Sequence, residues 1–248
     1  MAAAAAGTHD GRVDPEGRPV GRRIVLGTLG LGALGVLTGS RLQAAEERVL
    51  AAIGPRDPTG LSQLVPAGTG FRYYSVTGGV PHRDATTYRL TVSGLVERPV
   101  TLSMADLAAL PQTRLVRDFQ CVTGWRVPQV PWSGVALPDL LDHVGVSAGA
   151  KALRFTSFDG TYTESLTLSQ ARRRDVLIAT RMLGGPVTGA HGGPVRLYVA
   201  PMYGYKSCKW LGGVEVTDHV QPGYWEELGY DVNAWVGKSN GRDDDPTA

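Results

Sequence analysis

The chain has 248 residues, of which 42% are hydrophobic and 19% charged, so it is long enough for one well-buried domain or two small ones. Its net charge of +2 comes from interspersed acidic and basic residues and gives no electrostatic basis for nucleic-acid binding. The 33 glycines and 16 prolines favour a loop-rich architecture over a helical bundle.

The first 45 residues have the pattern of an export signal. Arg22 and Arg23 precede residues 24–39, a stretch without charge that is rich in Leu, Gly and Val. Paired arginines at this position resemble a twin-arginine signal. The alternative is a membrane helix, although the stretch is shorter than the roughly 20 residues that a span needs. We therefore expect residues 1–45 to be a twin-arginine-type export signal or an N-terminal anchor, and the protein to be periplasmic or extracytoplasmic.

Three further parts follow the signal. Residues 46–66 begin with a short helical pattern and continue with several prolines and a glycine, which predicts a linker. Residues 67–240 are expected to form one domain. Residues 241–248 are polar and acidic, and we expect a disordered tail.

The pattern within the domain predicts short strands mixed with short helices. Residues 88–94 alternate as a half-buried strand does. Ser103 and Asp106 have capping-box spacing, which predicts a helix over 104–110, and Pro138 is suited to the first position of a helix over 138–144. Without regular βαβ repetition, this pattern predicts an α+β fold. Further strands are expected at 114–120, 152–157, 161–167, 176–181, 194–200 and 212–218, and a short helix near 169–174.

The two cysteines allow two interpretations. Cys121 and Cys208 are 87 positions apart, and a disulfide closing so long a loop would stabilise the fold by roughly 4 kcal/mol. That interpretation describes a secreted binding module without a cofactor. Alternatively, the Cys121 thiolate is a soft ligand for a thiophilic redox metal. The two exclude each other, because a bridged sulfur cannot bind a metal.

The order of four segments carries a resemblance. Residues 117–125 (RDFQCVTGW), 131–135 (PWSGV), 191–196 (HGGPVR) and 203–211 (YGYKSCKWL) follow one another as in the sulfite oxidase superfamily of molybdopterin-dependent oxidoreductases. The chain looks closest to the bacterial exported branch that includes the protein-methionine-sulfoxide reductase catalytic subunit. The resemblance covers roughly residues 71–240. It implies a single-domain sulfite oxidase-type molybdopterin-binding fold, with mixed sheets and short helices.

The resemblance also implies a metal site. Cys121 would supply its thiolate to one molybdenum per chain, while a pterin dithiolene supplies the other sulfurs. Arg117 or Arg126 could favour the deprotonated thiol, with an ordinary surface charge as the alternative. Tyr230 takes the place of a substrate-side tyrosine near the metal, with simple packing as the alternative.

Further residues would hold the pterin. Arg196 would bind its phosphate through a planar guanidinium, and the paired glycines after His191 would let the backbone approach the ligand. His191 is either a polar pterin contact or a turn residue. Lys206 and Lys209 would add positive charge, and Cys208 is interpreted as a small core-like residue. The implied cofactor contacts are Tyr74, Ser75, Ser157 (or a turn cap), His191, Arg196, Ser207, Cys208 and Lys209.

The implied function is an exported molybdopterin-dependent oxidoreductase that transfers an oxygen atom. Ser75 lies near the position where sulfite oxidases have an arginine in an anion pocket, which favours a neutral substrate such as a sulfoxide or a similar X=O compound. Because the chain has no haem motif, we expect a membrane haem- or quinol-linked electron donor, and a monomeric protein. Oxidation of sulfite or another small oxyanion is the alternative, and a pterin-binding protein without efficient turnover is a third possibility.

Overall fold

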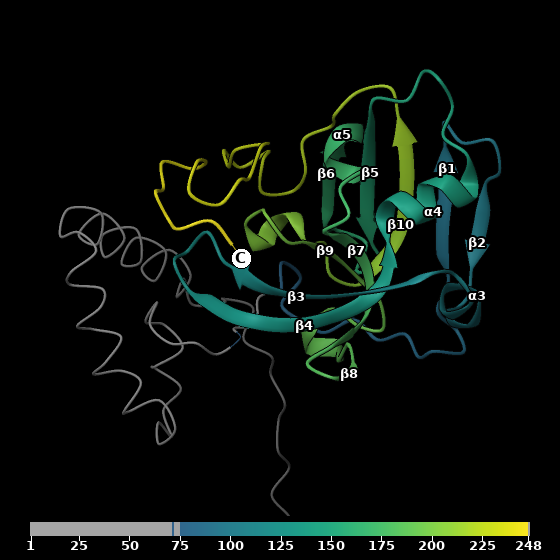
Figure 1. Ribbon diagram of the computed structural model, residues 1–248, viewed down its shortest axis with the longest axis horizontal. Helices are drawn as coiled ribbons and strands as arrows, with labels where there is room; N and C mark the ends of the chain where they lie inside the picture. The colour runs from purple at the N-terminus through teal and green to yellow at the C-terminus, as the bar shows by residue number, and fades with distance from the viewer. Residues whose placement is uncertain (1–70, 72–74, 248) are drawn as a thin grey trace, which may run out of the picture. The chain divides into compact units, whose positions relative to one another are not determined.

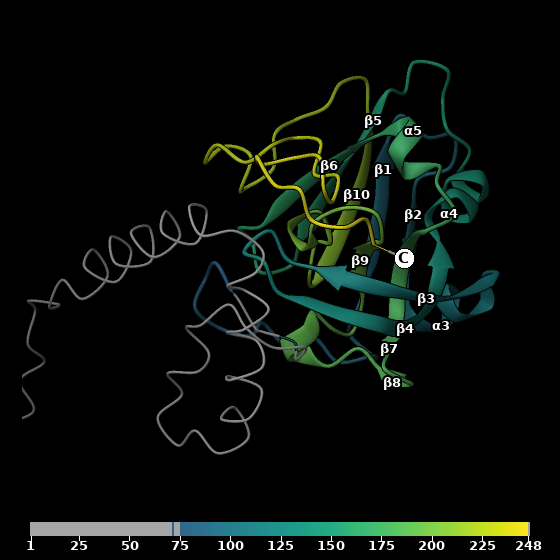
Figure 2. The same ribbon diagram turned by 60° about the vertical axis from the view of Figure 1, so that its left-hand side comes forward.

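The computed structural model of the protein describes residue 71 and residues 75–247. These residues form two β-sheets with three short α-helices (Figures 1 and 2). The predictions for the signal at 1–45, for the linker at 46–66 and for Tyr74 fall outside the described residues. In the part of the chain that is described, no helix is long and apolar enough to cross a membrane.

The first sheet is mixed, with the strand order β2-β1-β10-β5-β6. Strand β1 runs parallel to β10, and every other neighbouring pair is antiparallel. The parallel pair joins strands from the two ends of the domain sequence. The strands are β1 (Leu90–Gly94), β2 (Val100–Leu102), β5 (Ala152–Ser157), β6 (Thr163–Thr167) and β10 (Leu211–Thr217).

The second sheet is antiparallel and has the order β3-β4-β7-β8, with β9 also paired to β7. Its long β3–β4 hairpin runs crosswise to the strands of the first sheet (Figures 1 and 2). The strands are β3 (Gln112–Gln120), β4 (Arg126–Ala136), β7 (Val176–Met182), β8 (Gly185–Pro186) and β9 (Arg196–Val199).

The short helices begin where the sequence provides a cap. Helix α3 (Met104–Ala109) starts after a capping box between Ser103 and Asp106, as predicted. Helix α4 (Leu137–Val144) has a proline in its first turn and ends at Gly145, whose φ of 70° suits glycine. Helix α5 has only the four residues Leu168–Ala171. Two 3₁₀ helices follow, η3 (Gly189–His191) and η4 (Gly204–Lys206).

Strands β7 and β9 of the second sheet are covered on both faces. In β7, Val176 and Ile178 belong to the main hydrophobic core, whereas Leu177 and Ala179 pack in a smaller cluster on the opposite face. Strand β9 alternates in the same way. Burial on both faces explains why these strands are almost continuously apolar in sequence. The smaller cluster contains Phe119, Trp125 and Trp132, and Cys121 packs against it.

The predicted helices and strands from residue 88 onward are confirmed within a few residues, but the longest strand was missed. Strand β4 contains Pro128 and Pro131, which disfavour a strand because proline lacks a backbone N–H. The structure places both prolines in the half of β4 that pairs only with β3, since pairing with β7 covers Trp132–Ala136. Among the described residues, no second strand pairs with that half, so proline is tolerated there. The short β2 was missed as well.

The segment after Gly241, expected to be disordered, contacts the domain. The Arg126 guanidinium donates hydrogen bonds to the carbonyl oxygens of Asp245 and Pro246, both at 3.0 Å. Thr247 Oγ1 donates to Ala200 O at 2.7 Å, and Tyr203 Oη donates to Asp244 Oδ2 at 2.8 Å. These bonds hold the segment beside one end of the β3–β4 hairpin, where the yellow trace ends in Figure 1.

Candidate active site at the tip of the β3–β4 hairpin

Cys121 is the first residue of the tight connection between β3 and β4. Its backbone N–H donates to Trp125 O at 2.9 Å, and Gly124 N–H donates to Cys121 O at 3.0 Å. The side chain is half-buried, and its Sγ lies 3.2 Å from Thr123 Oγ1. Gly124 adopts a φ of 104°, a conformation that favours glycine. The connection therefore presents a partly accessible thiol on a closed, hydrogen-bonded turn.

An ion pair fixes the base of this turn. Arg126 opens β4 and lies 2.5 Å from Asp118 of β3, whose side chain is buried. The second oxygen of Asp118 accepts a hydrogen bond from Gln129 N at 2.9 Å. Arg126 thus serves to hold the hairpin, and its charge is already balanced by Asp118.

Aromatic rings connect the hairpin to the loop that contains His191. The Phe71 ring lies 5.6 Å from Phe119, 6.3 Å from Trp125 and 4.9 Å from the His191 ring. Trp125 and Phe119 stack on each other with their centroids 5.6 Å apart. The predicted metal ligand and a predicted pterin contact are therefore joined by one aromatic cluster, which excludes water from one side of the site.

Arg196 lies beneath the predicted cofactor loops and is only 3% exposed. Its guanidinium donates hydrogen bonds to the carbonyl oxygens of Leu197, His191 and Ser207, at 3.3, 2.7 and 2.9 Å. The guanidinium carbon also lies 5.4 Å from the centroid of the Phe119 ring. Much of the donor capacity of Arg196 is thus used to tie loops together. The sequence predicted that Arg196 binds phosphate through its guanidinium, and it did not predict that Arg196 holds the loops together.

His191 and Lys209 are half-buried cationic candidates on adjacent loops. Burial, then the charges of Arg196 and Lys209, lowers the pKa of His191, so its imidazole is neutral. Burial, then the charge of Arg196, lowers the pKa of Lys209 to about 7, while Asp159 partly opposes this shift. A bound anion would stabilise the protonated ammonium.

The paired glycines are explained by contacts within the chain. A Cβ at Gly192 would lie 2.6 Å from the side chain of Lys209, and one at Gly193 would lie 2.0 Å from Val187 O. Gly192 also has a φ of 98° and accepts a hydrogen bond from Trp210 N at 2.9 Å. The glycines therefore bring the loops against each other, whereas the sequence had suggested an approach to a ligand.

Ser207 and Cys208 point into the protein. Ser207 Oγ accepts a hydrogen bond from Val199 N at 3.0 Å, and Cys208 is fully buried, as expected of a core-like residue. Burial raises the pKa of the Cys208 thiol, so it remains protonated. Only backbone groups of these two residues remain as candidate contacts for a cofactor.

The other predicted contacts are more loosely connected to this cluster. Ser157 ends β5 and its Oγ accepts a hydrogen bond from Asp159 N at 3.1 Å, which is the turn-cap role. Ser75 is half-buried, with its Oγ 3.1 Å from Thr77 Oγ1. Tyr230 is half-buried and packs 5.4 Å from both Tyr205 and Trp225. Burial, then the charge of Cys121, raises the pKa of Tyr230.

Lys206 is in a different environment from the one predicted. Instead of facing a phosphate, its ammonium is fully buried and pairs with Glu164 at 2.6 Å and with Glu226. Sequence reasoning missed both carboxylates. A signal for Glu164 was available, because it is spaced two residues from both Tyr162 and Leu166 and so shares their face of the strand.

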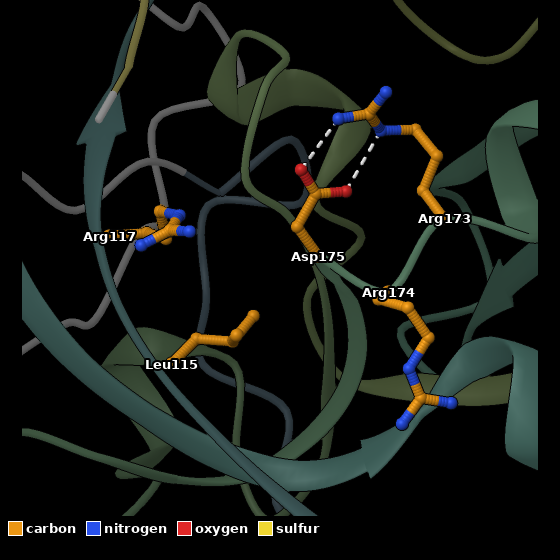
Figure 3. Close-up of a pocket in the computed structure, with 5 residues that line it drawn as sticks. All are labelled: Leu115, Arg117, Arg173, Arg174 and Asp175. Carbon is orange, nitrogen blue, oxygen red and sulfur yellow. Dashed lines mark hydrogen bonds and ion pairs between the residues drawn. The ribbon is translucent and has the colours of Figure 1, made fainter.

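The cavity of about 410 Å³ drawn in Figure 3 lies elsewhere. Arg117, Arg173 and Arg174 surround it, together with Leu115 and Asp175, and none of these is a candidate cofactor residue. Arg173 forms a two-bond ion pair with Asp175 in this cavity. Arg117 is exposed and lines this cavity, which agrees with the alternative of an ordinary surface charge.

The residues around Cys121 fit a molybdenum-pterin group. The donor set offers one accessible thiol, a half-buried ammonium and a buried indole N–H, that of Trp125, for which the described residues provide no hydrogen-bond partner. Among the described residues, no three His, Cys, Asp or Glu side chains gather as a metal site. Cys121 and Cys208, both described, are not joined by a disulfide, which removes the basis of the disulfide-stabilised module.

Comparisons with known proteins show the family to which the chain belongs. The family "Oxidoreductase molybdopterin binding domain" matches residues 77–225, more than half of the chain. The chain is 37% identical over 155 residues to the uncharacterized oxidoreductase YuiH of Bacillus subtilis, covering 62% of this chain and 78% of that protein. It is 30% identical over 237 residues to YedZ1 of Azospira oryzae, named as a proposed protein-methionine-sulfoxide reductase subunit, covering 89% and 88% of the two chains.

A solved structure supports the fold. The sulfane dehydrogenase SoxCD from Paracoccus pantotrophus superposes with a TM-score of 0.52 at 24% identity, over 57% of this chain and 41% of that chain. At this level of identity the likeness concerns the fold alone. The predicted sulfite oxidase-type α+β fold is confirmed.

Proposed function

Because the chain belongs to the family of oxidoreductases with a molybdopterin-binding domain, we propose that it transfers an oxygen atom and reduces a sulfoxide or a similar X=O substrate. The chain is an enzyme of this family, and its cofactor is molybdenum-molybdopterin. The observation that carries the proposal is the placement of Cys121, a partly accessible thiol on the closed β3–β4 turn. It packs against the same hydrophobic cluster as Phe71, whose ring contacts that of His191.

When bound, the cofactor supplies two-electron oxygen-atom transfer at molybdenum. In this proposal Cys121 binds the metal as a thiolate, and the closed turn from Cys121 to Trp125 keeps the sulfur in place. The Asp118–Arg126 ion pair stabilises that turn from below. The Phe71, Phe119 and Trp125 rings keep water away from the thiol.

The phosphate of the pterin is assigned to Lys209, with the neutral His191 imidazole as a polar neighbour. The Lys209 ammonium is half-buried, and an anionic group would restore the charge that burial disfavours. Arg196 acts mainly from beneath, by holding the carbonyl groups of His191 and Ser207. The backbone N–H groups of the Ser207–Lys209 loop are further candidate contacts.

The substrate is proposed to be uncharged. Ser75, near the position where an arginine would complete an anion pocket, bonds to Thr77, and Tyr230 offers a neutral phenol. The reaction consumes two electrons and two protons and yields the reduced substrate and water. The neutral Tyr230 phenol, whose pKa burial raises further, can donate a hydrogen bond to the substrate oxygen. The name of the relative YedZ1 also favours a sulfoxide.

The test is turnover of molybdenum-loaded protein with methyl sulfoxides, N-oxides and sulfite, using a dye as electron donor or acceptor. We expect dye-dependent reduction of sulfoxides with little oxidation of sulfite. Faster sulfite oxidation would favour the alternative assignment. Absence of both activities in protein with one molybdenum per chain would contradict the proposal.

We also propose export by the twin-arginine route and a membrane haem- or quinol-linked electron donor. Export can be tested by cell fractionation of the Arg22→Lys, Arg23→Lys double variant, which we expect to remain as precursor in the cytoplasm. Normal export of this variant would contradict the route. The proposed enzyme acts as a monomer.

A further inference from the structure

A fully buried ion cluster lies directly behind the predicted cofactor loop. Lys206 belongs to η4, Glu164 to β6, and Glu226 to the loop that leads to Tyr230. The side chains of all three are 0% exposed. With all three groups ionised, the cluster would carry an uncompensated negative charge away from water, which is strongly unfavourable.

The hydrogen bonds distinguish the two carboxyl groups. Glu226 uses both oxygens as acceptors, Oε1 toward Lys206 and Oε2 toward Gly223 N at 2.7 Å. Glu164 uses only Oε1, which accepts from Lys206 at 2.6 Å and from Ser165 N at 2.8 Å. Glu164 Oε2 is buried and receives no hydrogen bond from any described residue. An oxygen that accepts nothing is the natural place for a proton.

We propose that Lys206, held between a protonated Glu164 and an ionised Glu226, is a positioning residue that fixes the Ser207–Lys209 loop relative to the loop carrying Tyr230. The three groups are then neutral in sum, and each acceptor oxygen faces a donor. The proton on Glu164 Oε2 can be shared with the Glu226 carboxylate.

The contacts around the cluster explain how it acts on the site. Tyr224 N–H donates to Thr163 O at 3.0 Å, next to Glu164, so the loop carrying Tyr230 is joined to β6 by backbone as well as by side chains. A Cβ at Gly223 would lie 2.9 Å from Glu164 Oε1, so the loop packs tightly on the cluster. This inference rests on the proposed function, since that function places Lys209 and Tyr230 at the cofactor and the substrate.

The electrostatic environment supports this protonation state. Burial raises the pKa of Glu164 to about 8, Lys206 opposes this shift, and the charge and hydrogen bond of Glu226 add to it. The titratable groups that face Glu164 are Lys206, Glu226, Tyr162, Tyr205 and Cys208.

The first experiment is infrared spectroscopy of the full-length protein at pH 7. We expect the carbonyl stretch of a protonated carboxylic acid in the wild type, its loss in Glu164→Gln, and its loss in the wild type as the pH rises above about 8. The exposed neighbour supplies a matched control, because Glu227→Gln should retain the band. A wild type without the band, or a Glu164→Gln variant that keeps it, would overturn the protonation assignment.

The second experiment is hydrogen exchange of the cofactor-free protein, which reports on positioning without turnover. In Glu226→Gln an amide NH₂ replaces one acceptor, so either Lys206 or Gly223 N loses its partner. We expect at least about tenfold faster exchange in residues 204–209 and 223–230, and no change in Glu227→Gln. If Glu226→Gln does not fold, Glu226→Asp, which shortens the side chain by one methylene, replaces it. Unchanged exchange in the folded variant would overturn the positioning role.

Molybdenum content and the Mo(V) electron paramagnetic resonance spectrum of the loaded protein separate the two proposals. Altered signals in Glu226→Gln, with a wild-type signal in Glu227→Gln, support the inference. Suppose that the wild type binds no molybdenum, but that it shows the infrared band and that Glu226→Gln exchanges faster than the wild type. This result would refute the site assignment and leave the cluster established. If the wild type is loaded and active but lacks the infrared band, and Glu226→Gln exchanges no faster than the wild type, only the proposed role of the cluster is refuted.

Discussion

The Nη1 atom of Arg196 donates a 2.7 Å hydrogen bond to the carbonyl oxygen of His191, five residues earlier in the chain. Through Nη2 the same guanidinium binds Ser207 O on the next loop, at 2.9 Å. One buried side chain therefore joins the two loops that the sequence had assigned separately to the pterin. Its importance to the site follows from this geometry even if it contacts no ligand.

Arg196→Lys is expected to destabilise the protein by about 2–4 kcal/mol, because a compact ammonium cannot reach three carbonyl groups that a planar guanidinium binds. Urea unfolding measures the change, and Arg114→Lys on the exposed face of β3 is the control. A loss within about 0.5 kcal/mol, the range of surface substitutions, would contradict the tying role. Molybdenum content should fall in parallel.

Cys121→Ser should lower turnover by on the order of 100-fold or more, because metal sites lose up to that factor even when only an outer partner is removed. The thiol is half-buried, and serine keeps a group able to hydrogen-bond Thr123, so the unfolding temperature should change little. Cys208→Ser is the matched comparison, since it alters the core and leaves the thiol at the hairpin. Undiminished activity of Cys121→Ser would remove the metal-ligand assignment.

The cofactor-free protein should gain stability relative to Lys209→Met as the pH rises from about 7 toward 10.5. Over this range the unfolded chain keeps Lys209 protonated, whereas the folded protein has lost that proton, so the unfolded state binds more protons. Below pH 7 the buried ammonium is retained at a cost of a few kcal/mol at most. Chemical unfolding at a series of pH values tests this, and parallel curves for the two proteins would contradict it.

Arg126→Met should destabilise the hairpin by about 1–3 kcal/mol, because it leaves the buried Asp118 carboxylate without its ionic partner. Faster hydrogen exchange is expected in residues 121–125 and in 242–247, since Arg126 also binds the carbonyls of Asp245 and Pro246. Arg117→Met removes an exposed arginine of the same hairpin and should leave both segments unchanged. Equal exchange in Arg126→Met and Arg117→Met would contradict the stabilising role of Arg126.

Much of the fold could be predicted from local patterns. The capping box at Ser103, the proline in the first turn of α4 and the alternation of residues 88–94 each express short-range physics, and each element formed where it was expected. Strand β4 could not be predicted in this way. Its prolines are tolerated because half of the strand lacks a second partner, and pairing between distant segments decides that.

The sequence by itself determined the family and the cofactor, because a motif and its order along the chain are local properties. Only the tertiary structure decided what the basic residues do. Arg196 ties loops together, Lys206 is neutralised by two buried carboxyl groups, and Lys209 remains half-buried near Arg196. The three cations look alike in sequence, and their roles differ because burial and partners from distant strands set the energy of each charge.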